Sequence, residues 1–136
     1  MARNNTEELE AIVTQFLSKV SLDCQADRYQ FRLAEFCNVH GDAWHRYAGY
    51  AGVYYLFSDD GIVHYVGEGI SLKYGLGYRV LQNAAKFGLI EKPAMKVGLI
   101  SFDKSDLPFA LALEQFLIRD LAPPCNTLGK SEVGSK

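Results

Sequence analysis

The sequence has few of the residues with which small proteins form disulfide bonds or bind structural metal ions. Three cysteines, Cys24, Cys37 and Cys125, occur among its 136 residues, an odd number at irregular spacing. This pattern argues against a framework of disulfide bonds. Cys37 lies close in sequence to His40 and His45, but no C-x₂₋₄-C pair accompanies them, so zinc binding is the less favoured interpretation. We expect Cys37 to lie in a small apolar cluster, with both histidines near the surface.

Long apolar runs and an excess of positive charge are also missing. The uninterrupted apolar runs are too short to cross a bilayer, and the polar, acidic start "MARNNTEELE" does not resemble a signal peptide. We therefore expect a cytoplasmic protein that does not associate with membranes. The formal net charge of −2 excludes general electrostatic attraction to nucleic acid. Residues 62–100, however, carry five basic and two acidic side chains, so this zone could face phosphates.

The length suits one compact domain, and its first third is only partly interpretable. The segment "TEELEAIVTQFLSKV" has apolar residues at steps of three and four, which predicts an amphipathic helix capped by Asn5 or Thr6. The segment "RYQFRLAEF" is compatible with a helix or a strand, and the pattern leaves residues 21–48 unassigned.

From residue 51 onward the signals are clear. Residues 51–57 and 62–67 are rich in β-branched and aromatic residues around Asp60-Gly61, which predicts a β-hairpin. A helix over about 78–87 ends at Gly88, a strand follows over 96–102, and a last helix has Pro108 in its first turn and stops before residues 123–124.

This order predicts an α+β fold in which a small antiparallel three-stranded sheet is flanked by helices, in the order β-β-α-β-α. Residues 1–48 form an N-terminal helical extension, residues 49–128 the main domain, and residues 129–136 a flexible tail.

Two tyrosines of the predicted hairpin are candidates for a shared role. Opposed residues of a hairpin have positions that sum to a constant, and a loop of two or four residues makes this sum odd. Tyr54 and Tyr65 also sum to an odd number, so such a loop places both on one face. A three-residue loop would place them on opposite faces. The alternative is that the tyrosines simply suit half-buried strands.

A carboxylate interrupts the apolar stripe of the last helix. Glu114 lies seven residues after Leu107 and seven before Leu121, which places it in the middle of the face expected to meet the core. A buried carboxylate needs a cation, hydrogen bonds or a metal ion. Arg79 is the only arginine between residues 47 and 118, and periodicity places it with Gln82, Asn83 and Lys86 on the polar side of its helix.

Taken in order, these elements resemble the GIY-YIG nuclease family. Gly52-Val53-Tyr54 and Tyr65-Val66-Gly67 correspond to the two tripeptides that name the family. Arg79 resembles its helix arginine, Glu114 its metal-binding glutamate, and Asn126 the asparagine after its last helix. The resemblance covers about residues 50–128, and five positions in the right order on the right elements form a specific signal.

The resemblance implies divalent-metal-dependent hydrolysis of phosphodiester bonds by an endonuclease, with DNA as the favoured substrate. Glu114 would hold Mg²⁺ or Mn²⁺, Tyr54 would be the general base, and Arg79 would stabilise charge on the phosphate. Tyr65 would position water or phosphate. Contacts to nucleic acid are expected from Gly67, Lys73 and Asn126. Because the chain is acidic overall, a homodimer or a partner protein is expected to supply substrate affinity.

Two other functions compete with this one. Glu68 follows the second tripeptide, where it would repel a phosphate, and "RVLQNAAKFGL" has none of the histidines common near the family's arginine. These departures favour a nuclease fold with little or no turnover that binds nucleic acid or regulates. Without the resemblance, Glu114 and Arg79 could form a structural ion pair in a small interaction domain.

Overall fold

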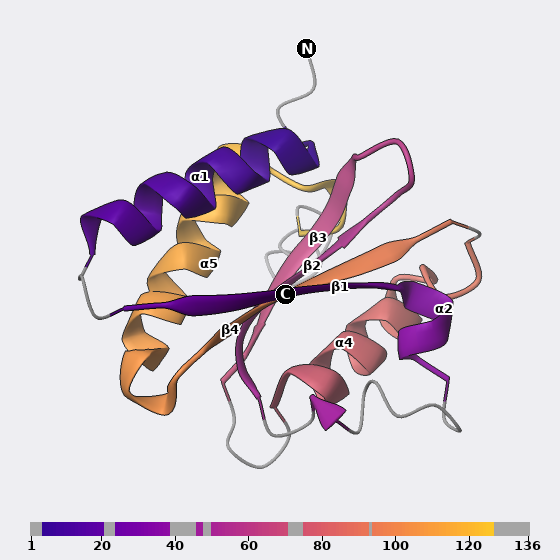
Figure 1. Ribbon diagram of the computed structural model, residues 1–136. Helices are drawn as coiled ribbons and strands as arrows, with labels where there is room; N and C mark the ends of the chain where they lie inside the picture. The colour runs from indigo at the N-terminus through magenta and orange to yellow at the C-terminus, as the bar shows by residue number, and fades with distance from the viewer. Residues whose placement is uncertain are drawn as a thin grey trace, which may run out of the picture.

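The protein is built on one four-stranded antiparallel sheet with helices on both faces (Figure 1). The computed structural model describes residues 4–20, 24–38, 46–47, 50–70, 75–92 and 94–126. The expectations for Lys73, for His40 and His45 and for the tail 129–136 fall outside the described residues. None of the helices in the described ranges is both long and apolar enough to span a membrane.

The sheet has one strand more than the sequence predicted. Its order is β1-β4-β2-β3, with β1 at Ala26–Arg32, β2 at Ala51–Phe57, β3 at Val63–Gly69 and β4 at Lys96–Phe102. The α+β class and the three predicted strands are confirmed, but a three-stranded sheet is wrong. The extra strand β1 comes from the segment that the pattern left unassigned. It is an edge strand, where half-buried Tyr29 and Phe31 alternate with exposed polar residues.

Helices cover the two faces of the sheet in pairs. The helices α1 (Thr6–Lys19) and α5 (Leu107–Leu121) lie on one face, and α2 (Leu33–Phe36) and α4 (Gly75–Lys86) lie on the other (Figure 1). The Asn5 side chain caps α1 as predicted, accepting a hydrogen bond of 2.8 Å from the Glu8 backbone N–H. Residues before position 49 thus add a strand and a covering helix to the same sheet.

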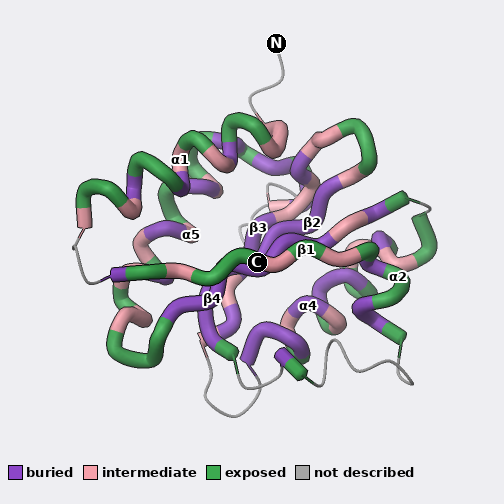
Figure 2. Tube along the Cα trace, in the orientation of Figure 1, coloured by how far each residue is buried: buried purple, intermediate pink, exposed green. Residues whose placement is uncertain are grey.

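The central strand β2 separates two apolar cores. All seven of its residues are buried, as Figure 2 shows along the middle of the molecule. Val53, Tyr55 and Phe57 face α1 and α5, whereas Tyr54 and Leu56 face α2 and α4. A strand buried on both faces must be apolar throughout, which explains the continuous run "AGVYYLF".

The hairpin between β2 and β3 combines a three-residue loop with a β-bulge, and together they give the predicted placement of the two tyrosines. The Ser58 N–H bonds to the Ile62 carbonyl and the Gly61 N–H to the Ser58 carbonyl, so the loop has three residues. An odd loop alone would separate the two tyrosines. A β-bulge shifts the register, because Phe57 pairs with Val63 whereas Leu56 pairs with Tyr65, which leaves His64 as the extra residue. This bulge restores the odd sum and returns Tyr65 to the face of Tyr54.

Candidate active site along strand β3

The tyrosines Tyr54 and Tyr65 lie side by side on the α4 face of the sheet. Their ring centroids are 6.0 Å apart, and the prediction that they share a face is confirmed. Tyr54 pairs directly with Gly67 across the hairpin. A Cβ atom at Gly67 would lie only 2.6 Å from the Cζ and hydroxyl oxygen of Tyr54. The glycine of the second tripeptide therefore provides the space in which the tyrosine of the first one lies.

The hydroxyl of Tyr54 is buried and hydrogen-bonded. Tyr54 is 0% exposed, and its oxygen accepts a hydrogen bond of 2.7 Å from the Nδ2 of Asn83. The carbonyl of Arg79 lies 3.3 Å from the same hydroxyl, within reach of its proton. Burial, the largest cause, raises the pKa of Tyr54 well above 10. A neutral phenol without access to water is poorly placed for the general-base role suggested by the resemblance.

Tyr65 has the more accessible hydroxyl. The residue is only partly buried, on the edge strand β3. Burial is the largest cause that raises the pKa of Tyr65, while a hydrogen bond from Tyr54 lowers it. Glu114 and Glu68 also raise this pKa by their negative charge, and Arg79 lowers it by its positive charge. Three charged side chains thus act on one phenol that solvent can reach.

Arg79 holds Tyr54 through its backbone and leaves its side chain available. Its carbonyl oxygen accepts from the Nδ2 of Asn83 at 3.1 Å, while its guanidinium donates to Gln82 at 3.3 Å. No ion pair joins Arg79 to an acidic side chain among the described residues. Gln82 lies on the exposed side of α4, whereas Asn83 is buried. Periodicity placed both on the polar side of the helix, which suits a solvated face or a cleft for a charged ligand, and only the structure shows that Asn83 bonds Tyr54.

The position of Glu114 on α5 is rotated from the predicted one. The buried face of α5 consists of Ala110, Leu113, Leu117 and Leu121, whereas Leu111 is 39% exposed. Glu114 lies roughly 60° around the helix from Leu117, at the border of this face. It is therefore partly buried rather than central. The predicted buried stripe of α5 is correct at Ala110, Leu117 and Leu121 but wrong at Leu111, which is exposed. The face that packs against the sheet is therefore rotated from the predicted one.

The carboxylate of Glu114 lies in a locally acidic environment. Burial is the largest cause that raises its pKa, and the nearby charge of Glu68 raises it further. A hydrogen bond from the Nε2 of Gln115, 3.1 Å long, and the charge of Arg79 oppose these effects. No ion pair to Glu114 occurs within the described ranges. The alternative of a structural ion pair between Glu114 and Arg79 is thus not realised there, and Glu68 and Arg79 act on the pKa of Glu114 in opposite directions.

Asn126 attaches the segment after α5 to the edge of the sheet. Its Oδ1 accepts from the Val66 backbone N–H and its Nδ2 donates to the Val66 carbonyl, both at 2.8 Å. These bonds satisfy backbone groups that an edge strand would otherwise expose. The resemblance implied a contact of Asn126 with nucleic acid, whereas in the structure its side chain fixes the segment after α5 to Val66. These contacts also explain why the residue follows the last helix at this point.

We predict that Asn126→Ala lowers stability by about 1–3 kcal/mol, because two partly buried backbone groups lose their partners. The free energy of unfolding in urea measures this cost. Hydrogen exchange at the Val66 amide should accelerate more than exchange at Tyr55, in the central strand. An unchanged Val66 exchange rate would contradict the role of Asn126 at this edge.

We predict that Glu114→Gln is more stable than the parent protein at neutral pH. Since the pKa of Glu114 is raised in the folded state, folding favours its protonated form. The parent's stability therefore falls as pH rises from the ordinary glutamate pKa, about 4.3, through the raised folded value. Below this window both proteins carry a neutral side chain, and the difference should vanish. Melting temperatures across this pH range test the prediction, with Glu91→Gln at an exposed position as the control for lost charge. A difference that is constant with pH would contradict it.

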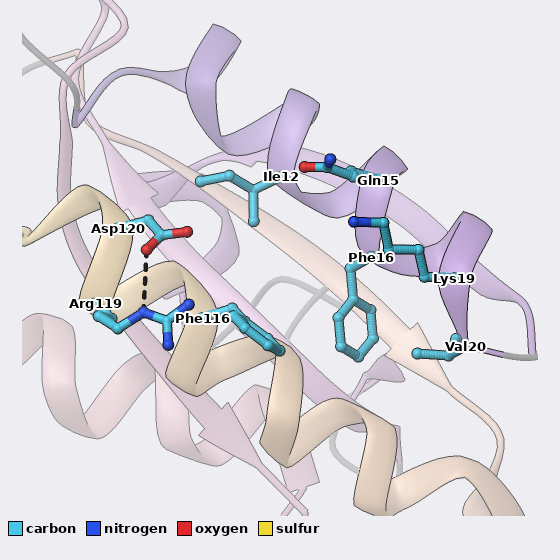
Figure 3. A pocket seen from close by; sticks show the side chains of 8 residues that line it. All are labelled: Ile12, Gln15, Phe16, Lys19, Val20, Phe116, Arg119 and Asp120. Carbon is cyan, nitrogen blue, oxygen red and sulfur yellow. Dashed lines mark hydrogen bonds and ion pairs between the residues drawn. The ribbon is translucent and has the colours of Figure 1, made fainter.

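A separate cavity lies away from this site. It has a volume of about 420 Å³ and lies between α1 and α5 (Figure 3). Its lining includes Phe16 and Phe116, whose ring centroids are 5.8 Å apart, and Arg119, which stacks over Phe116 at 4.7 Å. None of the predicted site residues lines it. The cavity therefore carries no part of the proposed chemistry.

Comparisons with protein-family models, with curated protein sequences and with solved structures give no match to this chain.

Proposed function

We propose that this protein hydrolyses phosphodiester bonds of nucleic acid, with DNA as the favoured substrate, in a divalent-metal-dependent reaction at the edge of β3. The observation that carries the proposal is the placement of Arg79 and Glu114 so that their opposite charges both act on Tyr65. They come from helices on opposite faces of the sheet, and both act electrostatically on the Tyr65 hydroxyl. Neither is neutralised by an ion pair within the described residues. A cation and a carboxylate kept apart in this way suit a charged ligand and a metal ion.

Glu114 fits the requirements of a magnesium or manganese ligand. Its carboxylate is partly buried, has a raised pKa and lies near a second carboxylate, Glu68, so a bound divalent cation would relieve a local excess of negative charge. No group of three or more metal-binding side chains occurs in the described part of the chain. Mg²⁺ tolerates this, since it commonly keeps several waters and takes only one or two carboxylates. When bound, the ion would polarise the phosphate and stabilise the leaving oxygen.

Arg79 would stabilise the negative charge that develops on the phosphoryl oxygens. Within the described part of the chain its guanidinium makes one hydrogen bond, to Gln82, and its five N–H groups leave donors for two phosphate oxygens. Asn83 and Tyr54 bond its backbone carbonyl and so fix the first turns of α4 against the sheet. The arginine is thus positioned before substrate binds, which is the condition for effective electrostatic stabilisation.

The two tyrosines would divide their roles by burial. Tyr65 has the accessible hydroxyl and would orient the attacking water or a phosphate oxygen by hydrogen bonding. Tyr54 would act as a positioning residue, because its buried hydroxyl donates to the backbone carbonyl of Arg79 and its ring packs against that of Tyr65. This assignment replaces Tyr54 as the water-contacting base, since its hydroxyl has no exposure.

A second function, binding without turnover, has one specific observation in its favour. Glu68 lies near Glu114, where its charge repels phosphate unless a cation intervenes. A protein of this kind would bind nucleic acid or a regulatory partner and would not cleave. In either case the acidic net charge favours a homodimer or partner protein as the source of substrate affinity.

The deciding experiment is incubation of the protein with supercoiled plasmid and with labelled single-stranded, duplex and branched DNA. Each substrate is tested with Mg²⁺, with Mn²⁺ and with EDTA. The nuclease proposal expects cleavage with a divalent ion and none with EDTA. Glu114→Gln, purified in parallel, excludes a contaminating nuclease. Binding to any substrate without cleavage under all conditions would favour the binding module instead.

A further inference from the structure

A cluster of tyrosines lies on the α4 face of the sheet, between the edge strand β1 and the start of β2, whereas the proposed active site lies at the opposite edge, on β3. We define the tyrosine platform as Tyr29 of β1 together with Tyr47 and Tyr50, which precede β2. The Tyr47 ring lies 4.9 Å from those of both Tyr29 and Tyr50, and the Tyr29 and Tyr50 rings are 6.3 Å apart. The three rings thus form one contiguous aromatic surface.

The platform combines a buried base with an exposed ring. Tyr47 is 5% exposed and belongs to the core of this face, whereas Tyr50 is 39% exposed and Tyr29 is intermediate. Core packing explains Tyr47 but does not require an exposed tyrosine on top of it. Tyr50 meets Tyr47 edge-on, with an interplanar angle of 71°. Its exposed surface is therefore available to a flat ligand.

A positive charge accompanies the rings. The guanidinium of Arg46, an exposed residue, lies over Tyr47 at 6.0 Å from the ring centroid. Arg46 also acts on Tyr29, where it lowers a pKa that burial, Asp27 and the neighbouring tyrosines raise. Aromatic rings with an adjacent arginine are the combination that proteins use to stack nucleobases and to follow the phosphate backbone.

The platform is joined to the helix that carries Arg79. The carbonyl of Tyr50 accepts from the Leu76 N–H at 2.8 Å, and that of Tyr47 accepts from the Gly77 N–H at 3.2 Å. Arg79 follows Leu76 by three residues, which is about 4.5 Å along the helix axis. A nucleic-acid strand that runs from Arg79 along the first turn of α4 would therefore bring one of its next bases to the platform.

We propose that the tyrosine platform stacks an unpaired base of the nucleic acid that is cleaved at β3. This deepens the proposed function and rests on it. A base within a continuous duplex is covered on both faces by its neighbours, so only an unpaired base presents a face to a protein ring. The substrate class is consequently a nucleic acid with unpaired bases, single-stranded or branched, and not uninterrupted duplex.

The test measures binding in EDTA, so that cleavage does not enter it. Fluorescence anisotropy compares a labelled single-stranded oligonucleotide with a duplex of the same length. The parent protein is expected to favour the single strand, and Tyr50→Leu to weaken that binding about tenfold or more, the effect of losing one stacked base. Tyr50→Phe keeps the ring and should bind like the parent.

A matched control separates the platform from exposed aromatic surface in general. Phe116 on α5 is 40% exposed and lies outside the tyrosine platform, so Phe116→Leu should leave binding unchanged. Melting temperatures verify that all variants fold. Equal single-strand binding by Tyr50→Leu and the parent, or tighter binding of duplex than of single strand by the parent, would overturn the proposal.

The outcomes for the platform and for the nuclease are independent. Divalent-dependent cleavage together with unchanged binding by Tyr50→Leu would refute the platform and leave the nuclease standing. Single-strand binding that requires the Tyr50 ring, without cleavage under any condition, would support the platform and refute the nuclease.

Discussion

Arg79→Ala is expected to reduce divalent-dependent cleavage by about 10²- to 10³-fold, the loss typical of one electrostatic stabiliser of the transition state. The fold should remain intact. The contacts that hold Tyr54 and Asn83 use the backbone carbonyl of Arg79, which alanine retains. Alanine also favours the helical conformation of α4. Single-turnover rates on the best cleaved DNA measure the effect, and thermal unfolding confirms the fold.

Glu114→Gln should abolish cleavage for a different reason, because the neutral amide keeps the shape of the side chain but loses the charge that attracts Mg²⁺. Added Mg²⁺ should raise the melting temperature of the parent and leave that of Glu114→Gln unchanged. The matched control for Arg79→Ala is Arg119→Ala, which removes an exposed arginine of α5. If Glu114→Gln cleaves as fast as the parent while Arg79→Ala does not, Glu114 is not the metal ligand of this reaction.

Gly67→Ala is expected to cause the largest loss of stability, about 3 kcal/mol or more, and to remove activity with it. The added Cβ would lie 2.6 Å from the Cζ and hydroxyl oxygen of Tyr54. That ring cannot move aside easily, because Tyr54 is 0% exposed and its hydroxyl is bonded to Asn83. Displacing it would also move the carbonyl contact to Arg79. Urea unfolding and cleavage assays measure the two losses.

A double-mutant cycle identifies the source of this cost. Tyr54→Leu removes the ring that the new methyl group would meet, so Gly67→Ala should cost much less in that background. Additive effects of the two substitutions would show that the glycine serves some need other than space for the tyrosine. The same arrangement occurs on the opposite face of the sheet, where Tyr55 pairs with Gly98 and a Cβ there would lie 2.1 Å from its Cζ.

Local signals in the sequence determined most of the elements. Strand β4 has the predicted bounds. Gly88, whose φ is 67°, lies just after α4 in the left-handed conformation that is common where helices end. Pro108 lies in the first turn of α5, where a missing N–H costs nothing. Each of these signals acts within a few residues of its own position. For this reason these helix and strand boundaries can be predicted from the sequence without knowledge of tertiary contacts.

The arrangement of the candidate site depended on contacts that no local pattern contains. The bulge at His64, which keeps Tyr54 and Tyr65 together, is a property of the pairing between β2 and β3. The phase of α5 was decided by the sheet face that it covers, and this moved Glu114 from the core to its border.

The pairing of distant residues likewise required the folded chain. Asn83 became a buried partner of Tyr54 because α4 packs on β2, and Asn126 met Val66 across 60 residues of sequence. The sequence of β1 was compatible with a helix or a strand, and its pairing with β4 decided for a strand. Apart from β1 and α2, the sequence by itself thus determined which helices and strands form, since short-range hydrogen bonding and periodicity govern them. Only the tertiary structure decided which side chains meet, because such contacts depend on packing between elements that lie far apart along the chain.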